Sequence, residues 1–344
     1  MVKRINLALQ GGGAHGAFTW GVLDRILEED GIEIAAISGT SAGALNGAAV
    51  KAGILADGNA GAREMLDWVW TQVASLDDMR MPAWMQAWLP SPGIISKTLE
   101  YSLPYMLTDT ASRMVSPYAW GPFYKNPLQP IVEKLDFGRV CADAGPRLCI
   151  CATSVRDGKI RVFTRHNIST EAILASACLP TMFQAVEVED PVTGVMEAFW
   201  DGGYTGNPAL FPLFERDLPD DIVIININPL HRQDLPVTPP EIQNRINEIS
   251  FNSSLLRELR AIDFVQRLLV ERSVPEGTMK RVLVHMISDD GLMNDLSVAT
   301  KLVAVPSVIA ELKAAGRRAA GDFLRLHYDD IGERQTVDLR SMFG

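Results

Sequence analysis

The chain has 344 residues, of which 47% are hydrophobic and 22% are charged, and its formal net charge is −10. This composition supplies enough apolar side chains for a large buried core and excludes a low-complexity disordered chain. Because no run of Lys or Arg is longer than a pair, the charge argues against a nucleic-acid partner and against electrostatic recruitment to anionic lipid. Any peripheral membrane contact is therefore expected to be apolar and transient.

The four cysteines do not form a metal or disulfide pattern. Cys141, Cys149, Cys151 and Cys178 contain no C-x-x-C pair, and no paired His ligands accompany them. No apolar run reaches transmembrane length, and the apolar start before Gln10 is too short for a secretory signal. The sequence therefore predicts a reduced cytoplasmic protein that uses neither a metal nor a cofactor.

The first fifty residues contain two strand–turn–helix units. Strands are predicted at 4–10 and 32–37, and helices at 14–29 and from 42 to about 52, where Gly53 ends the second helix. This order predicts an α/β fold with three layers, α/β/α, and a mainly parallel central sheet. Later strands are expected at 147–153, 159–164, about 184–189, 222–228 and 281–287, and later helices at 169–177, 239–271 and 296–315.

Residues 55–130 differ from the rest, because they hold five of the seven Trp and six of the thirteen Met. We interpret them as a helical cap inserted into a single domain that covers 1–344. Trp84 and Trp88 lie along one side of a short helix at 81–90, as core residues or as the lining of an acyl-chain pocket. The motif-bearing core spans 5–228, and 229–344 form a helical extension with one further strand. An apolar face of the helix at 239–271 is expected to pack against the sheet or a second subunit.

A glycine-rich loop, GGGAHG at 11–16, follows the first strand and fits the dinucleotide pattern G-x-G-x-x-G. That use also requires an acid at the end of the second strand, where it would bind the ribose. Glu33 lies at the start of that strand, and the strand ends in SGTSAG. A nucleotide- or phosphate-binding module therefore stays only as an alternative.

The G-x-S-x-G pattern at 39–43 indicates a nucleophile elbow, in which Gly39 and Gly43 flank Ser41 on a sharp strand-to-helix turn. A helix that begins at Ala42 would direct its N-terminal dipole toward Ser41 and stabilise an alkoxide there. The competing interpretation makes Ser41 an ordinary helix N-cap.

A nucleophilic serine needs a base. None of the five histidines has a local signature that selects it, so a Ser-His-Asp esterase stays open. Asp201, in FWDGGYTGNP, follows an apolar segment and precedes two glycines, where a desolvated carboxylate could take the serine proton. The alternative for Asp201 is an Asx-turn in a loop.

Taken together, GGGAHG at 11–16, GTSAG at 39–43, ASACLP at 175–180 and DGG at 201–203 make the chain resemble the patatin-like phospholipases over residues 5–228. The resemblance implies a lipid acyl hydrolase of the phospholipase A or lysophospholipase type. It implies Ser41 as the nucleophile, Asp201 as the general base and an oxyanion hole at Gly11, Gly12 and Gly13. An acyl-enzyme intermediate would form without a metal.

One residue departs from the family pattern, since His15 stands where Arg or Lys is common. A neutral imidazole there would change how the loop or an anionic headgroup is held, so His15 is a candidate substrate-binding residue. A lysolipid, a neutral ester, a thioester or a polyester is then an alternative to a phospholipid substrate.

Overall fold

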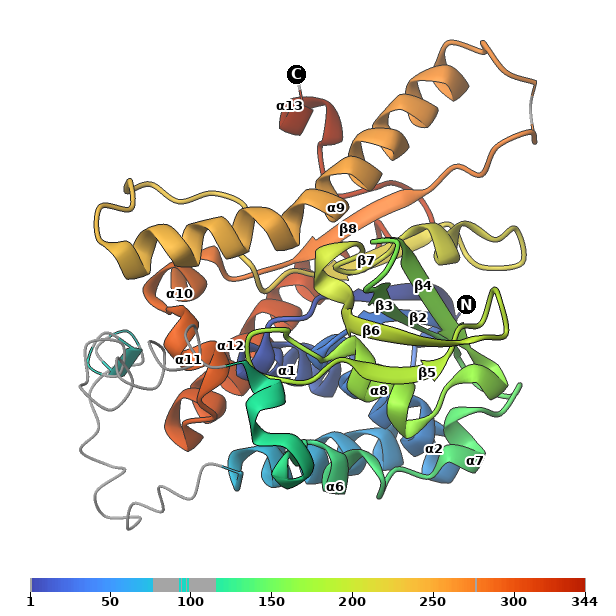
Figure 1. Ribbon diagram of the computed structural model, residues 1–344. Helices are drawn as coiled ribbons and strands as arrows, with labels where there is room; N and C mark the ends of the chain where they lie inside the picture. Colours follow the sequence, from blue (N-terminus) through green and yellow to red (C-terminus); the bar gives the residue numbers. More distant parts are fainter. Residues whose placement is uncertain are drawn as a thin grey trace.

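The structure is a computed structural model, and it describes residues 2–76, 93, 95, 96, 98, 116–275 and 277–343. A twisted central sheet lies between two helical layers (Figure 1). Its strands are β1 (Lys3–Leu9), β2 (Ile32–Thr40), β3 (Arg147–Ser154), β4 (Ile160–Thr164), β5 (Val186–Glu189), β6 (Met196–Asp201), β7 (Asp221–Ile225) and β8 (Leu283–Ile287). The predicted three-layer α/β class is confirmed.

Among the described residues the sheet has eight strands in the order β5-β6-β3-β2-β1-β7-β8, with β4 paired to β3. The pairs β3–β2, β2–β1, β1–β7 and β7–β8 are parallel, so their carboxyl ends lie along one edge. The pairs that involve β4, β5 and β6 are antiparallel. Loops that carry function in such sheets gather at the carboxyl edge.

Helices cover both faces of the sheet (Figure 1). One layer contains α1, α2 and α12, and α9 and α13 lie on the opposite face. The helices are α1 (Gly16–Ile26), α2 (Ala42–Ala74), α6 (Gln129–Val132), α7 (Phe137–Val140), α8 (Thr170–Ser176), α9 (Pro239–Val270), α10 (Asp290–Asp295), α11 (Val298–Leu302), α12 (Pro306–His327) and α13 (Leu339–Phe343). Short 3₁₀ turns are η1 (Gly13–His15), η2 (Pro117–Phe123), η3 (Arg165–Asn167), η4 (Gly202–Tyr204) and η5 (Phe211–Phe214).

Each central strand contributes side chains to two hydrophobic cores, because successive side chains point to opposite faces of the sheet. On β1, Leu7 and Leu9 enter the core beneath α1 and α12, whereas Ala8 enters the core beneath α9. On β7, Val223 and Ile224 divide in the same way. This two-sided burial explains why the strands read as continuous apolar runs.

The element α2 consists of two helical segments that meet at Asp57 and Gly58, where the backbone leaves the helical region. The first segment therefore ends a few residues beyond Gly53, where the sequence predicted its end. A Cβ at Gly53 would lie 2.3 Å from the Cα of Ala62, so this glycine lets the two segments of α2 pack closely. Gly53 is therefore a helix-packing residue and not a helix stop.

The start of the expected cap at 55 is also too early. The second segment of α2 packs into the main core, where Trp70 is 2% exposed and stacks on Trp20 with 6.2 Å between ring centroids. The indole Nε1 of Trp70 donates to Asn46 Oδ1 at 2.8 Å. Trp84 and Trp88 lie outside the described residues, so their predicted role in a cap stays a prediction.

Two further elements differ from expectation. The sequence did not predict β6, whose half-exposed residues lack a strong apolar pattern. The single helix expected at 296–315 is two helices, α11 and α12, because Pro306 begins α12 and the preceding Val305 is extended. This break leaves Lys301 near the end of a short helix beside the glycine-rich loop.

The predicted apolar face of α9 is only partly buried. Leu259 and Ile262 enter the core, whereas Ile242 and Ile246 are exposed. Of the helices in the described ranges, none combines the length and the hydropathy that a membrane crossing requires.

Candidate active site

Ser41 lies between β2 and α2 in a backbone conformation that is unusual for a residue with a side chain. Its φ is +55° and its ψ is −121°, and its side chain makes no N-cap hydrogen bond to α2. The hydroxyl instead lies close enough to the carboxyl group of Asp201 to act on its pKa. Ser41 thus has the strained strand-to-helix geometry of a nucleophile elbow, and the N-cap alternative does not describe its side chain.

The glycines around Ser41 are required by close backbone contacts. A Cβ at Gly39 would lie 2.5 Å from the carbonyl oxygen of Gly43, and a Cβ at Gly43 would lie 2.2 Å from that of Leu9. A Cβ at Gly11 would lie 2.7 Å from the Cβ of Ser41. The glycine-rich loop after β1 is therefore in direct contact with the serine turn after β2.

Asp201 ends β6 and is 1% exposed. Its Oδ1 accepts a hydrogen bond from the N–H of Gly203 at 2.7 Å, so the Asx-turn and the contact with Ser41 exist together. Burial raises the pKa of this carboxyl to about 7, although the hydrogen bond from Gly203 and the nearby Ser41 hydroxyl act in the opposite direction. A carboxyl with that pKa is half ionised near neutral pH and suits a general base.

Strand register brings the serine and the acid to one level of the sheet. Thr40 pairs with Cys151 across β2 and β3, and Ala152 pairs with Asp201 across β3 and β6. Asp201 is held on both sides, since its N–H donates to Cys178 O and its carbonyl accepts from Thr153 Oγ1, both at 2.8 Å.

Ser176, at the end of α8, supports the elbow from behind. Its Oγ accepts a hydrogen bond from the N–H of Ser41 at 2.9 Å and donates to the carbonyl of Cys151 at 2.6 Å. Both Ser176 and Cys178 belong to the ASACLP segment, which the sequence marked without giving these residues a role. The segment therefore fixes the backbone of both candidate catalytic residues.

Two N–H groups of the glycine-rich loop are open. The Gly11 N–H donates to Asn207 Oδ1 at 2.6 Å, so Gly11 cannot also serve an oxyanion as its motif suggested. The N–H groups of Gly12 and Gly13 have no hydrogen-bond partner in the described part of the chain. Gly13 has a φ of +58°, and a Cβ there would lie 2.2 Å from the carbonyl oxygen of Lys301.

A buried group of four amide side chains lies beneath this loop. Gln10 Oε1 accepts from the backbone N–H groups of Ile227 and Asn228, and Gln10 Nε2 donates to Asn252 Oδ1 at 3.1 Å. Asn207 and Asn228 each donate to the carbonyl of Gly11, at 3.3 and 2.9 Å. The oxyanion candidate is thus tied to β7 and α9, which no sequence motif indicated.

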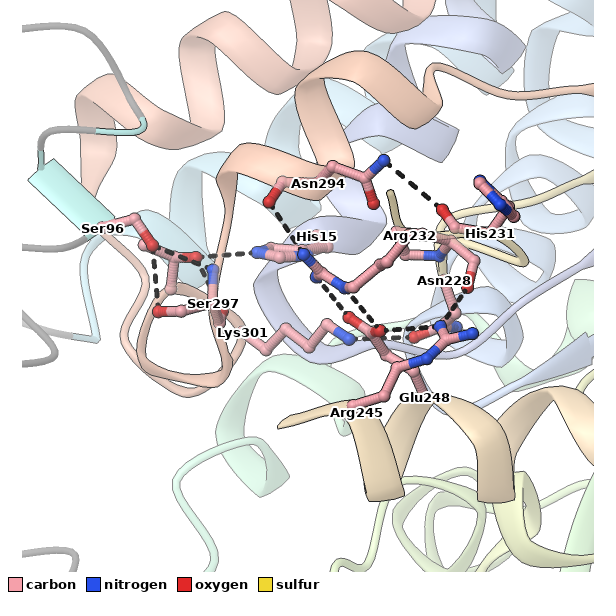
Figure 2. Close-up of polar contacts among 12 residues, drawn as sticks. His15, Ser96, Asn228, His231, Arg232, Arg245, Glu248, Asn294, Ser297 and Lys301 are labelled. Atoms are coloured by element: carbon pink, nitrogen blue, oxygen red, sulfur yellow. Dashed lines mark hydrogen bonds and ion pairs between the residues drawn. The ribbon is translucent and has the colours of Figure 1, made fainter. Parts of the chain in front are cut away.

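His15 is 1% exposed, and its predicted role in substrate binding stays a prediction. Its Nε2 is 2.9 Å from Thr300 Oγ1 (Figure 2). Because Thr300 donates its own proton to the carbonyl of Ser297, the imidazole Nε2 is the donor and Nδ1 is an unpartnered acceptor. Burial, and then the charges of Lys301 and Arg232, hold the pKa of His15 well below its usual value, so the ring is neutral.

None of the other histidines hydrogen-bonds Ser41 among the residues that the structure describes. His285 is buried against Asp221, with 2.9 Å between Nε2 and Oδ1, and His327 lies 2.8 Å from Asp330. His166 and His231 are exposed. Within the ranges that the structure covers, no cluster of three or more His, Cys, Asp or Glu could hold a metal ion.

Comparison with known proteins identifies a family. A family model described as patatin-like phospholipase matches residues 7–214. A sequence search of curated proteins finds no match. Similar solved structures include VipD from Legionella pneumophila, with 12% identity, a TM-score of 0.44 and coverage of 94% of this chain and 67% of that one.

A second similar structure is the ExoU–SpcU complex of the type III secretion system of Pseudomonas aeruginosa, with 17% identity and a TM-score of 0.33. The match covers 99% of this chain and 65% of that one. A separate structure of the type III effector ExoU is covered over 53% of its length. The chain thus spans between about half and two thirds of these proteins.

Proposed function

Because the chain belongs to the patatin-like phospholipase family, a family of lipid acyl hydrolases, we propose that it cleaves fatty-acyl carboxylic esters through a Ser41–Asp201 dyad. The observation that carries the proposal is the position of the Ser41 hydroxyl beside a buried carboxyl whose pKa is about 7, a pKa that the hydroxyl acts to lower. The substrate class that we propose is a phospholipid or lysophospholipid.

In the first half-reaction, Ser41 Oγ attacks the acyl carbonyl carbon while Asp201 takes the hydroxyl proton. The carbonyl oxygen becomes an oxyanion, and the open N–H groups of Gly12 and Gly13 donate to it, aided by the N-terminus of α2. Collapse of this intermediate expels the alcohol, which receives the proton from Asp201. The acyl group stays on Ser41.

In the second half-reaction, water attacks the acyl-serine and loses its proton to Asp201. The second tetrahedral intermediate uses the same oxyanion donors. Its collapse releases the fatty acid and returns the proton to Ser41 Oγ, so the enzyme ends as it began. The chemistry needs only side chains and backbone groups that this chain supplies.

The test is turnover of a lipid extract followed by mass spectrometry, with Ser41→Ala as the blank, together with p-nitrophenyl acyl esters. We expect free fatty acid from the wild-type chain alone and labelling of Ser41 by a fluorophosphonate. Equal product from wild type and Ser41→Ala would rule out the proposal. An active Asp201→Asn variant alongside an inactive histidine variant would replace the dyad by a Ser-His-Asp triad.

A further inference from the structure

The peptide unit between Gly11 and Gly12 carries two groups with opposite roles. Its carbonyl, on Gly11, accepts from Asn228 Nδ2 at 2.9 Å and from Asn207 Nδ2 at 3.3 Å. Its N–H, on Gly12, is one of the two open donors of the loop. Hydrogen bonds at the carbonyl end fix the peptide plane and polarise the N–H end, which makes that N–H a stronger donor.

Lys301 contacts the side-chain amide of Asn228 (Figure 2). The ammonium donates to Asn228 Oδ1 at 3.0 Å. An ammonium has only donors, so it attracts the amide oxygen and turns the amide NH₂ toward Gly11 O and Gln10 Oε1. A continuous chain of hydrogen bonds thus runs from Lys301 through Asn228 to the Gly11–Gly12 peptide.

The charged surroundings of Lys301 contain one carboxylate and two guanidinium groups. Glu248, 1% exposed at its side chain, accepts from Arg232 at 2.6 and 2.8 Å and from Arg245 at 3.2 Å. The neutral His15 completes the group around the loop. Lys301, from α11, therefore lies within a group of charges beside the loop in which His15 is neutral.

We propose that Lys301 is a positioning residue for the oxyanion loop, which aligns and polarises the Gly11–Gly12 peptide through Asn228. This inference rests on the proposed ester hydrolysis. If Lys301 acts in this way, its substitution should lower kcat, because the oxyanion exists only in the transition state and the intermediates.

The inference has a consequence for the pH profile. Burial, opposed by Glu248 and reinforced by Arg232, lowers the pKa of Lys301 to about 8. Activity should therefore rise through about pH 7 as Asp201 loses its proton, and fall through about pH 8 as Lys301 loses its own. A merely structural lysine would not produce the alkaline limb.

The test compares Lys301→Met and Lys301→Arg in the full chain with p-nitrophenyl butyrate as the substrate. For Lys301→Met we expect kcat to fall about 10-fold, KM to change less than about 2-fold, and the alkaline limb to disappear. Lys301→Arg should keep activity and lose the fall above pH 8, because a guanidinium stays charged. In an Asn228→Ala background, Lys301→Met should have little further effect.

The matched control is Lys280→Met. Lys280 is another partly buried lysine with a lowered pKa, but its Nζ donates to the carbonyls of Leu213 and Glu215. Its loss should leave the pH profile unchanged. The inference is overturned if the alkaline limb stays in place in Lys301→Arg, or if Lys301→Met changes KM alone. The Lys301→Arg result holds even if Lys301→Met folds poorly. Activity that is independent of Ser41 would overturn the proposed function and the inference together, so the two failures are distinguishable.

Discussion

Ser176 and Ser41 lie 2.9 Å apart, measured from the Ser176 Oγ to the backbone nitrogen of Ser41. The hydroxyl of Ser176 is completely buried and also donates to Cys151. It therefore satisfies a donor on the strained turn and connects that turn to the central sheet. The backbone of the candidate nucleophile is thus held by the side chain of a second serine.

Ser176→Ala should reduce both activity and stability. The substitution leaves the Ser41 N–H buried without a partner, which costs about 1–3 kcal/mol. We expect kcat to fall by about an order of magnitude and the urea midpoint to drop. Ser253→Ala, which removes a local helix hydrogen bond to Ser250, serves as the control and should change neither quantity appreciably. Normal kcat in a folded Ser176→Ala variant would contradict the proposed support of the elbow.

Asp201→Asn should abolish turnover but stabilise the fold above neutral pH. The pKa of Asp201 is higher in the folded state than its ordinary value of 3.8, so its contribution to stability is fully present below about pH 4 and is lost as the pH rises through about 7. Asparagine carries no charge to bury. At pH 8 we expect the free energy of unfolding to exceed that of wild type by about 2–4 kcal/mol.

Urea titrations of both chains at pH 4.5 and 8 measure this difference. Glu258, whose pKa burial raises to about 7, loses stability over the same range in both chains and cancels in the comparison. If Asp201→Asn is less stable than wild type at pH 8, burial of the ionised Asp201 carboxylate does not destabilise the fold.

The glycines of the loop should differ in tolerance. Gly13→Ala places a Cβ against the Lys301 backbone at a positive φ, so we expect loss of most activity and a lower melting temperature. Gly12→Ala meets a flexible side-chain tip, since its Cβ would lie 2.9 Å from Ile227 Cδ1. Its smaller loss in kcat should be partly restored by Ile227→Val, which removes that atom. No restoration in the double variant would show that steric conflict with Ile227 is not the cause.

A substitution at Asp24, on α1, tests the stability of the helical layer separately from activity. Burial would raise the pKa of this carboxyl, but Arg63, 2.8 Å away, and Arg317 outweigh it and lower the pKa. Its stabilisation is therefore present above the ordinary carboxyl range and is lost as the pH falls through the lowered pKa.

Asp24→Asn should cost about 2 kcal/mol at pH 7. The difference from wild type should shrink below about pH 4. Asp67→Asn breaks the exposed ion pair with Lys313 and should cost less than about 1 kcal/mol. Equal losses in the two variants at pH 7 would mean that burial of Asp24 adds nothing.

The sequence predicted the sheet, its central strands and the candidate catalytic residues Ser41 and Asp201, because these depend on local signals. Apolar runs that end in glycines indicate the strands, and each motif indicates the turn that it forms. The end of the first segment of α2 was misplaced because a glycine such as Gly53 can either end a helix or allow close packing, and the sequence does not distinguish the two. Lys301, Asn228 and Asn207 were missed because their relation to the loop exists only after distant segments pack together.

The amide group beneath the loop also bears on which part of the chain forms a working unit. Ser41, Asp201 and all three loop glycines lie within residues 7–214, yet Asn228, Asn252 and Lys301 lie beyond them. A polypeptide cut after residue 214 would keep every recognisable motif and lose the scaffold that aims the Gly12 N–H. Substitutions at Asn228 or Lys301 are therefore expected to lower turnover although every motif residue stays in place.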